Sequence, residues 1–168
     1  MATIRIPIDF RNPRVSSFAG NSFFTVTGLT VVDGGHWEFA KDVDGKIYGI
    51  VHIPTNVAAT TNGKIILAVG ANLASGITTL QISTKAIGNT ESLNPSALTA
   101  ESSQDITLPS PARTRTDVTF PAAGFLSEAL ASGDLLWVEV AHLGSTSLTD
   151  TLTVNTELWQ GLLEVSVS

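Results

Sequence analysis

Three short runs of alternating polarity in the last third of the chain constrain its fold more than any other feature. Residues 133–140, 150–154 and 159–167 are rich in β-branched or aromatic residues, and Gly, Ser, Thr and Asn separate them. Apolar residues at every second position are typical of a strand with one buried face, and turn residues at this spacing are typical of a sandwich. We therefore predict that the three runs are consecutive antiparallel strands.

The same pattern continues through the rest of the chain. Further strands are expected at residues 4–10, 22–27, 36–40, 47–53, 64–69, 77–87 and 116–120. Pro7 removes a ladder donor, so the first strand is expected at a sheet edge. Residues 94–101 and 125–130 are candidates for short helices, since Asn94 suits an N-cap and Gly133 a helix end. The expected fold class is all-β: a single antiparallel β-sandwich domain, residues 1–168, with one or two short helices.

The chain is short of charge for a soluble domain of 168 residues. Charged residues make up 14%, against about 25% on average, while hydrophobic residues reach 43%. We therefore expect part of the surface to be buried against copies of the chain or a partner. The expected contact segments are the N-terminal arm, residues 1–14, and a long polar loop, residues 88–110, because an edge strand and a long loop are free to pair with a neighbour.

Composition also argues against several classes of function. The chain has no cysteine, which removes disulfide frameworks and thiolate chemistry. Its net charge of −6 argues against a nucleic-acid partner, and the scattered arginines are expected on solvated strand faces or at contact rims. They are Arg5, Arg11, Arg14, Arg113 and Arg115.

Nothing in the sequence predicts a signal peptide or a membrane partner. The chain opens directly on a strand pattern, without a basic region followed by an apolar core. The longest uncharged run, residues 65–84, has roughly the length of a membrane span of about 20 residues, but Gly, Asn, Ser and Thr interrupt it.

No motif identifies a catalytic, cofactor or metal site, and we assign none. The three histidines, His36, His52 and His142, are expected to face solvent or to bond a backbone carbonyl. Asp42 and Asp44 resemble the start of a calcium loop, but position twelve would be Ile53, so a hairpin turn is the better interpretation.

Acidic and aromatic residues leave two alternatives open. A glycosidase would require two converging carboxylates, and the candidates on or beside strands are Glu38, Glu139, Glu157 and Glu164. The tryptophans Trp37, Trp137 and Trp159 could stack on sugar rings, but core or inter-subunit contacts are the preferred interpretation.

The C-terminal region resembles virion proteins of tailed bacteriophages. The resemblance covers residues 123–167, where Gly133-Asp134-Leu135-Leu136 opens an apolar strand and Leu158-Trp159-Gln160-Gly161-Leu162-Leu163 opens the last one. It implies a jelly-roll-like sandwich and no catalytic residue.

That resemblance leads to our main functional expectation, a capsid decoration or cement protein. Such a subunit would be made in the host cytoplasm and would sit on the virion surface as a homo-oligomer, expected to be a trimer. Its partner would be the major capsid protein, and it would be neither an enzyme nor dependent on a cofactor. The alternative is a carbohydrate- or receptor-binding module of a phage tail or fibre that uses an aromatic such as Trp37 or Trp159.

Overall fold

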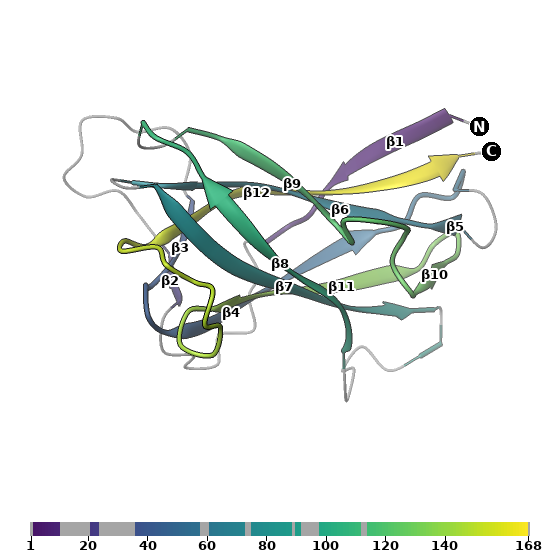
Figure 1. Cartoon of the computed structure of the whole chain (residues 1–168). Coiled ribbons are helices and arrows are strands. Elements are labelled where there is room, and N and C mark those ends of the chain that lie inside the picture. Colours follow the sequence, from purple (N-terminus) through teal and green to yellow (C-terminus); the bar gives the residue numbers. More distant parts are fainter. Residues whose placement is uncertain are drawn as a thin grey trace.

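A computed structural model of the chain describes residues 2–10, 21–23, 36–57, 61–72, 75–88, 90–91, 98–111 and 114–167, with the backbone alone for 21–23 and 61. This part of the chain contains twelve strands and no helix (Figure 1). In chain order they are β1 (Ala2–Pro7), β2 (Asn21–Phe23), β3 (Trp37–Phe39), β4 (Asp44–His52), β5 (Thr61–Asn62), β6 (Lys64–Ala71), β7 (Gly76–Ile87), β8 (Thr99–Leu108), β9 (Thr116–Phe120), β10 (Ala129–Leu130), β11 (Leu135–Leu143) and β12 (Thr156–Val167).

Two antiparallel sheets form a sandwich, as predicted. One sheet has the order β2-β3-β12-β6-β9, with β1 also paired to β12, and the other has the order β4-β11-β7-β8. The short strands β5 and β10 pair with each other. Figure 1 shows the two chain ends side by side, because β1 runs antiparallel to β12 and places Ala2 opposite Val167.

The last strand, β12, organises the six-stranded sheet. β3 and β1 pair with the same edge of β12 in succession, β3 along Thr156–Leu158 and β1 along Leu162–Val167, while β6 covers the other edge. The pairing with β6 shifts register between Leu158 and Gln160. Such a bulge changes which face each later residue takes, so Leu158 and Leu163, an odd number of positions apart, both point into the core.

Phe10 fills a slot that two glycines leave open between the sheets. A Cβ atom at Gly49 on β4 would lie 2.7 Å from Phe10 Cδ1, and one at Gly161 on β12 would lie 2.6 Å from Phe10 Cε2. Real Cβ atoms do not approach other carbons this closely, so each glycine is required by the ring. Phe10 and Ile8 are both buried, and the residues that follow β1 thus close one side of the core.

The first strand confirms the edge position predicted from Pro7. In the part of the chain that the structure describes, β1 pairs with β12 alone, and Pro7 is its last residue. Beyond it, the Asp9 amide donates to the Ile50 carbonyl at 3.2 Å, which links the arm to the other sheet. The expected contact arm is therefore held by its own sandwich over residues 2–10, and residues 11–14 lie outside the described residues.

The prediction of short helices is wrong where the structure describes the chain. Leu126 and Leu130 are buried four positions apart, a spacing that suits a helix, but the segment bends at residues 127–128 without forming a helix, and both side chains reach the core. The Leu126 amide donates to the Gly63 carbonyl at 2.8 Å, and residues 129–130 form β10. Of the other candidate, residues 99–101 belong to β8, and 92–97 lie outside the described residues.

The polar segment 88–110, expected to be a loop, contains a strand in its second half. Residues 99–108 form β8, which ends the four-stranded sheet and pairs with β7. Most side chains of β8 are exposed or half-buried, and Ile106 and Leu108 are buried. An edge strand with one face exposed to solvent needs few apolar residues, and this accounts for the polar composition of β8.

The expected C-terminal trio of strands is wrong in two respects. β11 and β12 belong to different sheets, and residues 148–154 form no strand. The amides of Thr151 and Leu152 both donate to the Ile77 carbonyl at 2.9 Å, and the Asp150 carboxylate accepts the Thr79 amide at 2.9 Å. Side chains that bond nearby backbone in this way compete with a strand ladder, although Leu152 is still buried in the core.

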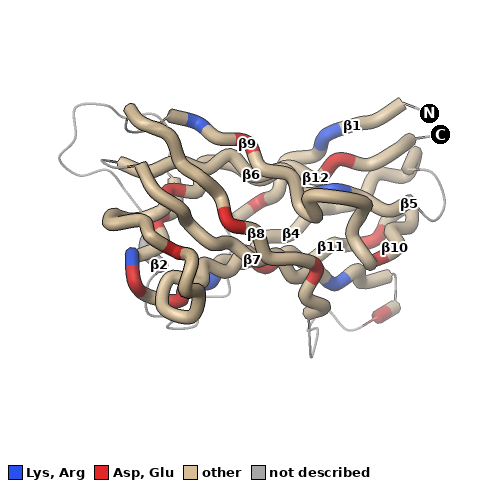
Figure 2. Tube along the Cα trace, viewed as in Figure 1, with Lys and Arg blue, Asp and Glu red and all other residues tan. Residues whose placement is uncertain are grey.

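The described surface carries few charges and few large apolar side chains. Figure 2 shows isolated basic and acidic residues separated by long uncharged stretches, with no cluster of basic residues in the described part of the chain. Three large apolar side chains are exposed among the described residues, and they lie in different segments: Phe125, Leu148 and Trp159. None of the described segments is a helix of the length and apolarity that crossing a membrane requires.

Candidate functional site

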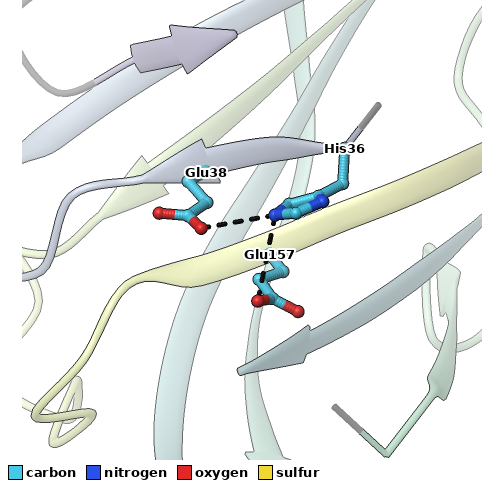
Figure 3. A group of neighbouring side chains, drawn as sticks. All are labelled: His36, Glu38 and Glu157. Atoms are coloured by element: carbon cyan, nitrogen blue, oxygen red, sulfur yellow. Dashed lines mark hydrogen bonds and ion pairs between the residues drawn. The ribbon is translucent and has the colours of Figure 1, made fainter. Parts of the chain in front are cut away.

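A cluster of buried polar side chains lies on β12 and at the start of β3. His36, Glu38 and Glu157 are 4%, 6% and 0% exposed. His36 Nε2 lies 3.3 Å from Glu38 Oε1 and 3.9 Å from Glu157 Oε1, and Figure 3 shows both carboxylates directed at the imidazole. Two acidic groups and one histidine therefore converge on a single point that solvent hardly reaches.

Strand register explains why these residues meet. Side chains alternate along a strand, so His36 and Glu38 share the face opposite to that of Trp37, which packs against the core. β3 pairs with β12 so that Glu38 lies directly opposite Glu157. The cluster thus lies on the outer face of the six-stranded sheet, away from the core between the sheets.

Two neutral donors hold the carboxylates in place. Asn155 Nδ2 donates to Glu38 Oε2 at 2.9 Å, and Trp159 Nε1 donates to Glu157 Oε2 at 3.1 Å. Each carboxylate therefore has its Oε2 atom fixed from outside, which leaves Oε1 directed toward His36.

Trp159 links this cluster to the surface. Its ring stacks on His36 with a centroid separation of 4.4 Å and an interplanar angle of 26°. The side chain is 36% exposed, and the neighbouring Gln160 is exposed as well. With one ring face on His36 and its nitrogen on Glu157, the indole is fixed in orientation while part of it still meets solvent.

The other two histidines behave as expected from the sequence. His52 is exposed at the end of β4. His142 is buried, with Nδ1 3.0 Å from the Val43 carbonyl and Nε2 3.0 Å from Asp150 Oδ2. The expectation fails for His36, because its neighbours are the two carboxylates. The His-x-Glu spacing on a strand indicates from sequence alone that His36 and Glu38 share a face. The position of Glu157 beside them follows only from the register between β3 and β12.

The four candidate carboxylates do not all converge. Glu139 pairs with Lys46 at 3.1 Å and Glu164 with Arg5 at 2.9 Å, so both serve ordinary ion pairs. Glu38 and Glu157 do come together, and both are buried. Of the arginines, Arg115 pairs with Asp117 on the surface, and Arg11, Arg14 and Arg113 lie outside the described residues.

Asp42 lies in a turn, but this turn is not the hairpin that the sequence predicted, because it joins β3 of the six-stranded sheet to β4 of the four-stranded sheet. Asp44 is the first residue of β4. Asp42 has a φ of 58°, the left-handed conformation that tight turns use. The Asp44 carboxylate accepts the amides of Ser145 and Thr146 at 2.9 and 3.1 Å and also the Thr146 hydroxyl. Burial alone would raise the pKa of Asp44, but these hydrogen bonds outweigh it and hold that pKa below its ordinary value.

A shallow hollow of about 510 Å³ lies where β4 and β7 end and β11 begins. It has a polar lining that includes His52, Thr90 and Glu91 together with Ser132 and Asp134. The two carboxylates already accept backbone amides of their own turns, Gly88 N to Glu91 at 2.9 Å and Ala131 N to Asp134 at 2.8 Å. No aromatic side chain lines the hollow among the described residues.

Comparison with known proteins identifies the fold and no family. No protein-family model and no curated protein matches this sequence. Among solved structures, the chain is similar to a family 35 carbohydrate-binding module from Clostridium thermocellum, with a TM-score of 0.50 and 12% identity over 99% of this chain and 100% of that one. It is also similar to the Arthrobacter globiformis T6 isomalto-dextranase in complex with panose, with a TM-score of 0.53 and 15% identity over 96% of this chain. The chain spans 23% of that enzyme's length. Both similarities show a β-sandwich fold shared along nearly the whole chain.

Proposed function

We propose that this protein is a carbohydrate-binding module and that Trp159 is its sugar-stacking platform. The observation that carries the proposal is the geometry of Trp159, which is partly exposed yet fixed by the His36 ring and the Glu157 carboxylate. The similarity to a binding module over the full length of both chains supports the same function.

A fixed indole suits the apolar face of a sugar ring. An aromatic side chain that is already ordered loses little conformational freedom when a ligand stacks on it. The exposed amide of Gln160, the next residue, can donate to and accept from hydroxyl groups. The scarcity of charge, seen in Figure 2, fits a neutral ligand better than a phosphate or a sulfate.

A glycan array followed by calorimetric titration of the best ligand tests this function. Trp159→Ala should weaken binding at least about tenfold, because tryptophans at the centre of a binding site contribute about 2 kcal/mol or more. Phe125→Ala is the matched control, since Phe125 is 60% exposed and lies in another segment; its affinity should match that of the wild type.

Two results would contradict the proposal in different ways. An array without reproducible binding would refute the glycan function. Binding that survives Trp159→Ala but is lost in Glu91→Ala would keep the function and move the site to the hollow at the ends of β4 and β7.

Binding without turnover is part of this proposal, because Glu38 and Glu157 are buried away from any polymer. The capsid-coating trimer stays a prediction. A shell contact of the usual kind needs a continuous apolar core, and the exposed large apolar side chains among the described residues are dispersed over three segments. The binding module is therefore the function that the described surface favours.

A further inference from the structure

We propose that His36, Glu38 and Glu157 form a binding site for a divalent transition-metal ion, with Zn²⁺ as the best fit. The three residues each place one possible ligand atom within 4.8 Å of those of the other two. The proposed ligand atoms are His36 Nε2 and the Oε1 atoms of the two glutamates, which are the carboxylate oxygens that approach the imidazole. The inference concerns the metal alone and holds whether or not Trp159 binds a glycan.

The distances already approach those of a coordination sphere. Zinc binds histidine nitrogen at about 2.0 to 2.1 Å and carboxylate oxygen at about 2.0 to 2.2 Å, so a nitrogen and an oxygen ligand of one ion are at most about 4.3 Å apart. The separations of His36 Nε2 from the two Oε1 atoms are 3.3 and 3.9 Å, both inside that limit. An ion can therefore be placed among the three atoms with small side-chain movements.

Charge is the second argument. Glu38 and Glu157 are direct cross-strand neighbours on one face, and like charges at such positions repel each other. Burial makes the repulsion stronger, because little water is present to screen it. A divalent cation at the shared point would balance both carboxylates.

The surrounding hydrogen bonds are arranged as around a metal centre. Metal-binding carboxylates are usually oriented by hydrogen bonds to the oxygen that does not coordinate. Here Asn155 Nδ2 and Trp159 Nε1 bond the Oε2 atoms of Glu38 and Glu157, and they leave both Oε1 atoms for the shared point.

The donor set selects the class of metal. Calcium prefers six to eight oxygen ligands, and magnesium keeps several waters, so neither has a use for a buried imidazole. One imidazole and two carboxylates suit zinc and its neighbours in the first transition row. The fourth position of a tetrahedral ion would be filled by a ligand other than these three side chains.

The test is to strip the full-length protein with EDTA, pass it over a desalting column and titrate it separately with ZnCl₂, MnCl₂ and CaCl₂. We expect one equivalent of zinc by calorimetry and by metal analysis, zinc affinity above that for calcium, and a melting temperature that rises with free zinc. Glu157→Gln and His36→Gln should lower zinc affinity at least about tenfold. Glu139→Gln, another buried strand glutamate, and His52→Gln, an exposed histidine, are matched controls that should bind as the wild type does.

Asn155→Ala gives a variant with every proposed ligand intact. Losing the hydrogen bond to Glu38 should weaken zinc binding by about 10- to 100-fold. The proposal is overturned if the wild-type protein takes up no zinc, if calcium binds more tightly than zinc, or if zinc uptake survives both ligand substitutions. The first of these results would mean that the two carboxylates are accommodated without a metal ion.

Discussion

Packing of Phe10 between Gly49 and Gly161 predicts a non-additive pair of mutations. Phe10→Ala removes a buried ring from a fully packed slot and should cost about 3 to 5 kcal/mol of the free energy of unfolding. Gly161→Ala places a Cβ atom 2.6 Å from the ring, which cannot retreat because Gly49 touches its other edge. That overpacking should cost about 1 to 3 kcal/mol.

The double mutant separates this mechanism from a general intolerance of substitution. Without the ring, the nearest remaining neighbour of the new Cβ atom is Ile8 Cδ1 at 3.0 Å, the movable end of a side chain. The cost of Gly161→Ala should therefore nearly vanish in the Phe10→Ala background. Urea unfolding followed by tryptophan fluorescence measures the free energy of unfolding of the wild type, the two single mutants and the double mutant. The dependence of that free energy on urea concentration should have the same slope in all four proteins. Costs that add to within about 0.5 kcal/mol would refute the shared slot.

Further stability predictions follow from single contacts. His142→Ala should cost about 1 to 3 kcal/mol in urea unfolding, because it removes one hydrogen-bond partner of the buried Asp150 carboxylate, which keeps the amides of Thr79 and Leu152. A loss below about 0.5 kcal/mol would contradict that role. Gly144→Ala should lower the midpoint of thermal unfolding, because the added Cβ atom would lie 2.9 Å from the Val43 backbone nitrogen. Gly70→Ala is the control and should leave the midpoint unchanged, because no atom lies closer than 3.6 Å to its added Cβ. Equal midpoints for the two variants would be inconsistent with this packing. Asp44 has a lowered pKa when folded, so its stabilisation is complete above its unfolded pKa of about 3.9 and disappears as the pH falls through the lower folded value. Urea midpoints at pH 6 and pH 2.5 should therefore differ less for Asp44→Asn than for the wild type, and an equal difference would argue against this role.

Alternating polarity predicted most strands because a half-buried strand must repeat every two residues. The runs that became β4, β6, β7 and β11 were found in this way. The same rule failed at residues 148–154, where side-chain hydrogen bonds from Asp150 and its neighbours replace the ladder. It also failed at residues 125–130, because two leucines four positions apart fit a helix and a non-helical segment equally well.

The candidate site shows where single-sequence reasoning ends. His36 and Glu38 share a strand face by their spacing alone, so two of the three residues of the cluster can be placed together from the sequence. Glu157 joins them through the pairing of β3 with β12, whose partners are more than a hundred residues apart in sequence. The sequence named Trp37 and Trp159 as candidates for a sugar contact, and the structure shows that Trp159 is the exposed one, whereas Trp37 packs against the core.

Contact between Trp159 and the ligand can be observed directly through the indole N–H signals of the protein. The chain has three tryptophans, so a ¹⁵N-labelled sample gives three such signals, which Trp→Phe variants assign. During titration with the best oligosaccharide from the array, we expect the Trp159 signal to shift and the signals of Trp37 and Trp137 to stay in place. A Trp159 signal that stays fixed at saturating ligand would contradict the proposed contact.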